Sequence, residues 1–291
     1  MKNKSFQDKV KEHMEKYAES NDELKGRIGG NWRGNPEPHI IKDKDKWYLN
    51  LFEQYRDEIV KYMRDNRIKK HTYAHHLTSS QMMCFNFFYP LLKNNLLSLI
   101  LKQIDSSIDW GKPQGEFEFL SKLERNQEQV LKNVEDYKGL EGVSNIDFHV
   151  TTNKGFQVYF EIKYTENSFD KFGDKNQDFP KYMRKVNYLY RPLWENSIIS
   201  LKEDEYFVKH YQVMRNLVQC ENNKTYVVFL LPEQNKRVWN EATIVKQELK
   251  IDKHCSILDW SDLTEQIKKE SKLTEYYNRF EGKYLNFLHS N

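Results

Sequence analysis

The chain has 291 residues, of which 31% are charged and 38% are hydrophobic, and its net charge is +3. This length suffices for one large domain or two small ones, and the composition argues against a disordered chain. The small net charge excludes a uniformly basic nucleic-acid coat, so a DNA-binding surface would need local clusters of Lys and Arg.

The three cysteines are widely spaced, and none forms a C-x-x-C pair: Cys84, Cys220 and Cys255. This pattern argues against a disulfide framework or a cysteine zinc site and fits a reducing compartment. The charged N-terminus lacks an apolar signal segment, and the longest apolar run, residues 96–101, is too short to cross a bilayer. We therefore expect a cytoplasmic protein that does not partner with a membrane.

Residues 1–75 predict a highly charged helical region that precedes the main domain, residues 76–291. Four apolar residues recur at helical spacing in its first part: Phe6, Val10, Met14 and Tyr17. A loop rich in Gly, Asn and Pro over 29–38 leads to a second amphipathic pattern over 47–68. The basic residues of this region would either contact DNA or a sister subunit, or simply form a solvated helix face.

Three histidines come next: His71, His75 and His76. They lack a matching set of cysteines or carboxylates, so we expect no zinc site here. Residues 77–90 then predict a buried helix that Thr78 or Ser79 caps and Pro90 ends.

Strand patterns begin near residue 145. Residues 147–164 predict a β-hairpin whose second strand carries Glu161 and Lys163 on one face and apolar residues on the other. A three-residue loop with Gly155 in the left-handed conformation would close it and place Asp147 directly opposite Glu161. Directly opposed residues have Cβ atoms roughly 4.5–5.5 Å apart.

The C-terminal part predicts further regular elements. Helical patterning covers 206–220, and residues 225–231 form a buried strand that Pro232 stops. A short strand over 256–258 precedes an amphipathic helix over 260–288, with Ser261 as its cap.

Two carboxylates this close repel each other unless a cation lies between them, and a hard divalent cation with oxygen ligands is the natural occupant. A Mg²⁺ ion held by Asp147 and Glu161, with the main-chain carbonyl of Ile162 as a further ligand, would suit phosphodiester hydrolysis. Lys163 would position or activate a water, or stabilise negative charge on the phosphate. The residues leave an alternative open: a solvated hairpin face with cross-strand pairs of Asp, Glu and Lys.

The spacing of Asp147, thirteen residues, and Glu161-Ile162-Lys163 resembles the PD-(D/E)xK nuclease signature, with Ile146 in place of the leading proline. Four segments, in the same order, resemble the PGN_0703-like group of restriction-endonuclease-type proteins: residues 76–91, 117–119, 161–166 and 211–216. This resemblance covers about residues 75–235.

The resemblance implies an α/β (α+β) fold with a restriction-endonuclease-like core, in which a central mixed β-sheet is flanked by helices. It implies that three residues carry catalysis: Asp147, Glu161 and Lys163. Glu118 would be the helical glutamate that completes the metal site, with Glu116 as its rival. Gln212 would lie near the site, and Arg215 would either touch a phosphate or form a surface salt bridge.

The implied activity is that of a type II restriction endonuclease, acting on double-stranded DNA as a homodimer with Mg²⁺, for which Mn²⁺ could substitute. A local basic stretch suits phosphate contact: Lys171, Lys175, Lys181, Arg184 and Lys185. Two alternatives stay open at this point. One is a structure-specific repair or antiphage nuclease, and the other is a non-catalytic DNA-binding protein on the same fold.

Overall fold

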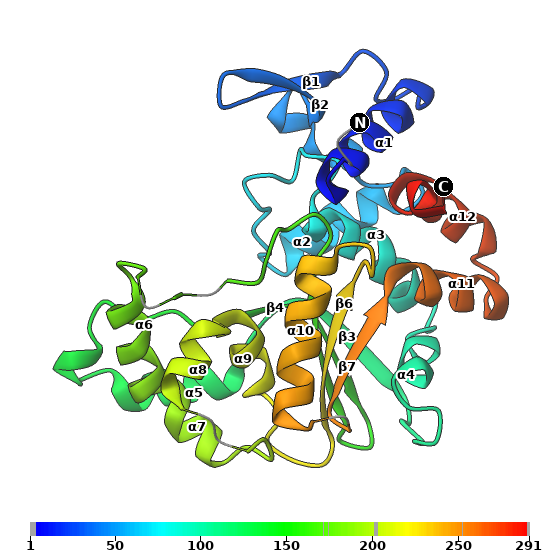
Figure 1. The fold of residues 1–291 in the computed structure, drawn as a ribbon. Helices are drawn as coiled ribbons and strands as arrows, with labels where there is room; N and C mark the ends of the chain where they lie inside the picture. Colours follow the sequence, from blue (N-terminus) through cyan, green and yellow to red (C-terminus); the bar gives the residue numbers. More distant parts are fainter. Residues whose placement is uncertain (1–3, 171, 174, 201–202, 252, 290–291) are drawn as a thin grey trace.

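A five-stranded mixed sheet forms the centre of the molecule in the computed structural model (Figure 1), which describes residues 4–170, 172–173, 175–200, 203–251 and 253–289. The strands lie in chain order: β3 (Pro113–Leu120), β4 (Asn145–Thr152), β5 (Gln157–Ile162), β6 (Thr225–Leu231) and β7 (Cys255–Asp259). Strand β4 runs antiparallel to its neighbours β3 and β5, whereas β5, β6 and β7 run parallel to one another. The predicted fold class is confirmed, including the buried strand over 225–231.

Helices cover both faces of this sheet, and each face has its own apolar cluster. Six helices contribute to the cluster on the first face: α1 (Phe6–Ser20), α2 (Arg56–Asp65), α3 (Ser80–Lys93), α4 (Ser98–Ile104), α11 (Trp260–Glu270) and α12 (Thr274–Tyr284). Six pack on the second face: α5 (Lys122–Leu131), α6 (Phe179–Lys185), α7 (Arg191–Glu195), α8 (Asp204–Lys209), α9 (Tyr211–Leu217) and α10 (Lys236–Leu249). A π-helical turn, Val186–Tyr190, joins α6 to α7, and 3₁₀ turns cover Lys44–Asn50, Glu135–Tyr137 and Asn286–His289. Within the described residues, no helix is both long and apolar enough to span a membrane.

The Gly-, Asn- and Pro-rich segment near the N-terminus is a two-stranded sheet and not the predicted loop. Strands β1 (Ile28–Trp32) and β2 (Asn35–Ile41) pair antiparallel around Arg33 and Gly34, both of which have positive φ angles. Two left-handed residues give a turn whose twist matches that of the flanking strands. Because the buried residues of α1 and α2 share an apolar cluster with α3 and α12, the division near residue 75 stays a prediction.

Three features of the predicted helices are wrong. Pro90 lies inside α3, and the carbonyl of Asn86, four residues earlier, accepts a hydrogen bond from the Tyr276 hydroxyl at 2.7 Å. Proline cannot donate to that carbonyl, so the tyrosine supplies the missing donor and the helix continues. The predicted C-terminal helix is divided into α11 and α12, and Asp259, not Ser261, caps α11 through the Ser261 and Asp262 amides.

Candidate active site

The β4–β5 hairpin has the predicted register. Phe148 pairs with Phe160, so continuing the ladder by one step brings Asp147 opposite Glu161. Gly155 closes the turn with a φ of +81°. This register follows from local turn chemistry, because the short loop allows only one pairing of the two strands.

Glu161 lies at the centre of a buried polar cluster, with only 3% of its surface exposed. Its Oε1 atom lies 2.7 Å from the Lys163 Nζ and accepts a hydrogen bond from the Gln212 Nε2 at 2.7 Å. Its Oε2 atom accepts a hydrogen bond from the Asn216 Nδ2 at 2.9 Å. Gln212 and Asn216 are one turn apart on α9 and therefore present their amides to the same carboxylate.

Asp147 is held from the backbone of the opposite strand. The amide of Ile162 donates to its Oδ2 at 2.7 Å. Burial, and secondly the nearby Glu161 carboxylate, raise the pKa of Asp147 well above its usual range, and the Lys163 ammonium only partly offsets them. The two carboxylates therefore conflict electrostatically as the arrangement stands.

Lys163 remains an ammonium in this setting. Burial works to lower the pKa of Lys163, but the surrounding carboxylates of Glu161, Glu166 and Asp147 outweigh burial and raise that pKa. The indole of Trp260 donates to the Lys163 carbonyl at 3.1 Å and fixes the backbone just beyond the strand end. The lysine is thus a positioned cation and not a free base.

Glu118 lies in strand β3 and not on a helix, which corrects the predicted position. Its φ angle is +52°, and Phe117 and Phe119 on either side belong to the apolar clusters of opposite sheet faces. The left-handed conformation of Glu118 thus switches the sheet face on which the next apolar side chain of β3 lies. Gln81 of α3 donates to its carboxylate at 2.7 Å, and Asn145 donates to its other oxygen.

The other acidic and basic residues that were predicted near the site have separate surroundings. Glu116 is exposed and pairs with His149 in the ladder, which leaves Glu118 as the better placed glutamate. The charge of Glu118 also contributes to the raised pKa of Asp147. Arg215 forms no salt bridge with a described residue, and its buried Nε has no hydrogen-bond partner. Burial works to lower the pKa of Arg215, but nearby groups, the Glu161 carboxylate first among them, outweigh burial and raise that pKa.

The predicted basic stretch is only partly a surface. Lys175, Lys181 and Arg184 are exposed on or beside α6, while Lys171 lies outside the described residues. Lys185 is buried, its ammonium donates to the Gly142 carbonyl, and burial lowers the pKa of Lys185. This lysine is therefore not part of the exposed stretch.

Sequence reasoning missed two residues of the cluster, Asn216 and Gln81. The signal for Asn216 was its position four residues after Gln212 on one helix face. The signal for Gln81 was a polar residue at the start of an otherwise apolar helix, and it is 3% exposed in the structure. Each donates an amide to a carboxylate near Asp147.

The donor chemistry of the strand ends fits a hard divalent cation. Asp147 and Glu161 present carboxylate oxygens, and the Ile162 carbonyl points to the same edge of β5 as its amide, which contacts Asp147. Burial and, secondly, repulsion from Glu161 raise the pKa of Asp147, and a cation between the carboxylates would relieve that repulsion. The described residues hold no group of three or more His, Cys, Asp and Glu side chains close enough together to bind a metal ion. The role of Glu118 as a metal ligand therefore stays a prediction.

A central mixed sheet flanked by helices, with an acidic pair and a lysine at neighbouring strand ends, defines a restriction-endonuclease-like α+β protein. The family model described as "Restriction Endonuclease associating with ARP" matches residues 3–285. The chain belongs to this family, which places it among the restriction nucleases, hydrolases that act on DNA. The match includes the N-terminal region that the resemblance found in the sequence left out. No curated protein and no solved structure gives a significant match.

Proposed function

We propose that the protein is a Mg²⁺-dependent endodeoxyribonuclease of the PD-(D/E)xK type, related to the PGN_0703-like group, that cuts double-stranded DNA as a type II restriction endonuclease. One observation carries the proposal: across the β4–β5 hairpin the Ile162 amide donates to the Asp147 carboxylate at 2.7 Å, and the Lys163 ammonium lies 2.7 Å from Glu161. Membership of a restriction-endonuclease family supports the same class of activity.

Asp147, Glu161 and the Ile162 carbonyl would hold the Mg²⁺ ion, or Mn²⁺ in its place, with Glu118 nearby as a further acidic group. When bound, such an ion polarises the phosphate and lowers the pKa of a water. Gln212 and Asn216 would keep the Glu161 carboxylate oriented, since their amides leave it little freedom to rotate.

Lys163 would stabilise the negative charge that develops on the phosphate and would hold the attacking water. The raised pKa of Lys163 favours this role over that of a general base, because a protonated amine has no free lone pair with which to accept a proton. Arg215, whose Nε is unpartnered near Glu161, would supply a second positive charge for DNA phosphate.

A homodimer in the cytoplasm would bring one such site to each DNA strand, and its two-fold symmetry would match a palindromic target. The exposed cations Lys175, Lys181 and Arg184 would contact the DNA backbone. Their contribution would fall as salt concentration rises.

The test is cleavage of unmethylated plasmid and genomic DNA by the purified protein with Mg²⁺ or with EDTA. We expect discrete fragments with Mg²⁺ alone and none from Lys163→Ala. Lys154→Ala is the matched control, because that lysine lies at the turn of the same hairpin, is exposed and forms an ion pair with Asp109. DNA binding without cleavage by the wild type under every metal condition would overturn the proposal in favour of a binding protein.

A further inference from the structure

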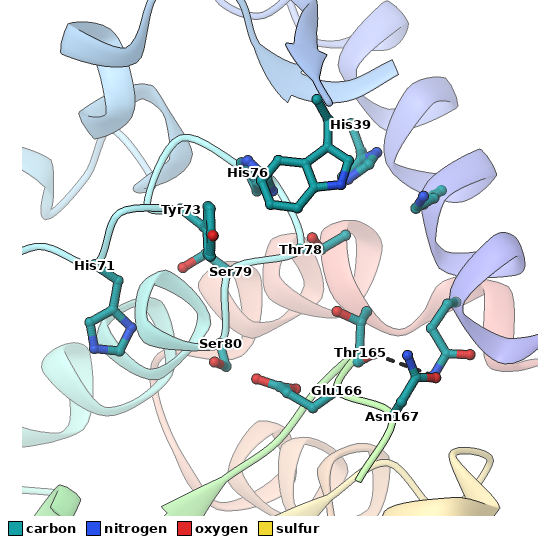
Figure 2. Close-up of a pocket in the computed structure, with 13 residues that line it drawn as sticks. His39, His71, Tyr73, His76, Thr78, Ser79, Ser80, Thr165, Glu166 and Asn167 are labelled. Carbon is teal, nitrogen blue, oxygen red and sulfur yellow. Dashed lines mark hydrogen bonds between the residues drawn. The ribbon is translucent and has the colours of Figure 1, made fainter. Parts of the chain in front are cut away.

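A pocket of about 470 Å³ lies between the N-terminal elements and the segment that follows β5 (Figure 2). Trp32 and His39 come from β1 and β2, Tyr73 and His76 from the segment before α3, and Glu166 from the segment after β5. The Gln7 side chain of α1 donates to the Thr165 carbonyl at 3.3 Å and ties the first helix to that segment. The volume lies in the range of ligand sites, roughly 300–1,000 Å³.

Aromatic rings form one wall of this pocket. Trp32 contacts Tyr73 and His76 edge to face, with ring centroids 5.1 and 5.4 Å apart. Tyr73 is 49% exposed although it is a large aromatic residue. A partly exposed group of rings offers π-faces on which a flat ligand can stack.

Two buried histidines add unpartnered polar atoms. His39 and His76 are 5% and 9% exposed, and neither the His39 Nδ1 nor the His76 Nε2 has a hydrogen-bond partner among the described residues. The Glu37 carboxylate lies 3.4 Å from the His39 Nδ1 without bonding to it. Burial lowers the pKa of His39 to about 4 and that of His76 to about 3, so both rings are neutral at neutral pH. A buried polar atom without a partner is costly. Because the protein covers both atoms, a ligand in the pocket reaches them only when a neighbouring side chain moves aside.

The charges of the pocket fit a neutral ligand better than a phosphate. Lys11 is its one lining cation of the Lys or Arg type among the described residues, and it already pairs with Glu37 at 3.2 Å. Glu166 adds a carboxylate, which accepts readily from the exocyclic amino group of a base. The pocket therefore combines stacking surfaces with hydrogen-bonding groups.

Both ends of the pocket reach the candidate active site. Glu166 follows Lys163 by three residues and contributes to the raised pKa of Lys163. At the other end, the His71 Nε2 lies 3.7 Å from the Glu118 carboxylate. A planar base in the pocket would thus belong to a nucleic-acid strand whose sugar-phosphate backbone passes the ends of β4 and β5.

We propose that this pocket binds one unpaired nucleobase of the DNA substrate, next to the phosphate that is cut. The inference rests on the proposed nuclease function and adds a substrate feature to it: a nucleotide that is extrahelical or is flipped out of the duplex. Enzymes that bind such a base read its Watson–Crick edge by hydrogen bonds and stack its face on aromatic side chains. The N-terminal region would then select substrate, while the hairpin cuts it.

The test compares binding of the full-length protein, in EDTA, to a duplex with one unpaired nucleotide and to the same duplex fully paired. We expect tighter binding to the first duplex. Trp32→Ala and Tyr73→Ala should each reduce that preference by about 5- to 100-fold, since stacking on one aromatic residue is worth this much. Trp32→Phe should retain most of the preference. Trp239→Ala is the matched control, because Trp239 is a half-buried tryptophan on α10, outside this pocket.

The outcomes separate this inference from the proposed function. Equal binding of the two duplexes, or a preference that survives both alanine substitutions, would overturn the base pocket. If Mg²⁺-dependent cleavage persisted in that case, the nuclease function would stand. Binding of free nucleosides without any preference among the duplexes would also overturn it, because the site would then serve a small molecule. The absence of both DNA binding and cleavage would instead refute the proposed function.

Discussion

Two buried lysines lie in opposite kinds of surroundings in this protein. Lys163 contacts the Glu161 carboxylate. Burial works to lower the pKa of Lys163, but the nearby acidic groups outweigh burial and raise it. Lys283 of α12 donates instead to the main-chain and side-chain oxygens of Asn50, at 2.6 and 2.7 Å. Burial, and secondly the positive charge of Arg56, lower the pKa of Lys283 well below its usual range.

We propose that the polar cluster around Lys163 serves the function, whereas the one around Lys283 stabilises the fold. Around Lys283, neutral groups satisfy one another, and the Asn86 amide donates both to the Asn50 carbonyl and to the Tyr284 hydroxyl. Around Lys163, two carboxylates face each other, and the pKa of Asp147 rises because of burial and, secondly, because the two charges repel each other. Such a conflict lowers stability and suits a site that is completed by a cation.

The largest effect that would sharpen this comparison is expected for Asp147→Asn. Cleavage should fall by about 10²- to 10³-fold or more, as for loss of one charge-stabilising group. The melting temperature in EDTA should nevertheless rise at pH 8, because the substitution removes the repulsion from Glu161.

The pH dependence gives the sign of that effect. The folded-state pKa of Asp147 is raised above its unfolded value of about 3.9, so the folded state retains a proton that the unfolded state loses. Wild-type stability should therefore fall, relative to Asp147→Asn, as pH rises from about 4 through the folded pKa. Thermal unfolding from pH 4 to 8 measures this difference. A lower melting temperature for the variant at pH 8 would show that the charges do not conflict.

Lys283→Ala should have the opposite profile. The free energy of unfolding should fall by about 2–4 kcal/mol, because the change leaves a cavity and removes the donor to the Asn50 side-chain oxygen. Cleavage by the folded variant, measured well below its melting temperature, should stay within about two-fold of wild type. A core substitution away from the candidate active site acts on stability and not on the chemistry. Lys283→Met retains much of the side-chain volume and should lose less stability. A large loss of cleavage in a well-folded Lys283 variant would break the comparison.

The smallest effect is expected for Gln212→Ala, which removes one of the two amides that hold Glu161. Loss of such a supporting contact lowers metal affinity or activity by roughly 10- to 100-fold, and we expect the lower end because Asn216 remains. The measurement is cleavage rate against Mg²⁺ concentration, and high Mg²⁺ should restore most of the rate. A rate that stays low at saturating Mg²⁺, together with a lowered melting temperature, would assign Gln212 a purely structural role.

The part of the site that lies on neighbouring strands was predictable from the sequence. Alternation of apolar and charged residues placed Asp147 and Glu161 on the predicted strands, and the loop ending at Gly155 set their register. The helical position of Glu118 was predicted wrongly because its left-handed backbone, which turns β3 over between the two sheet faces, leaves no mark on the residue pattern. Lys185 was likewise assigned to the surface, although tertiary packing buries it against Gly142.

Local interactions along the chain thus determined the strands, the hairpin register and the acidic pair, because each depends on residues close in sequence. Only the tertiary structure decided which distant groups complete the site. Gln212 reaches Glu161 from 51 residues away, and Gln81 reaches Glu118 from 37 residues away. The pocket that Trp32, His76 and Glu166 line also forms only when the N-terminal elements pack beside the end of β5. Such contacts depend on how two helical layers pack on one sheet. Hydrophobic periodicity predicts the elements themselves but not which distant elements pack together.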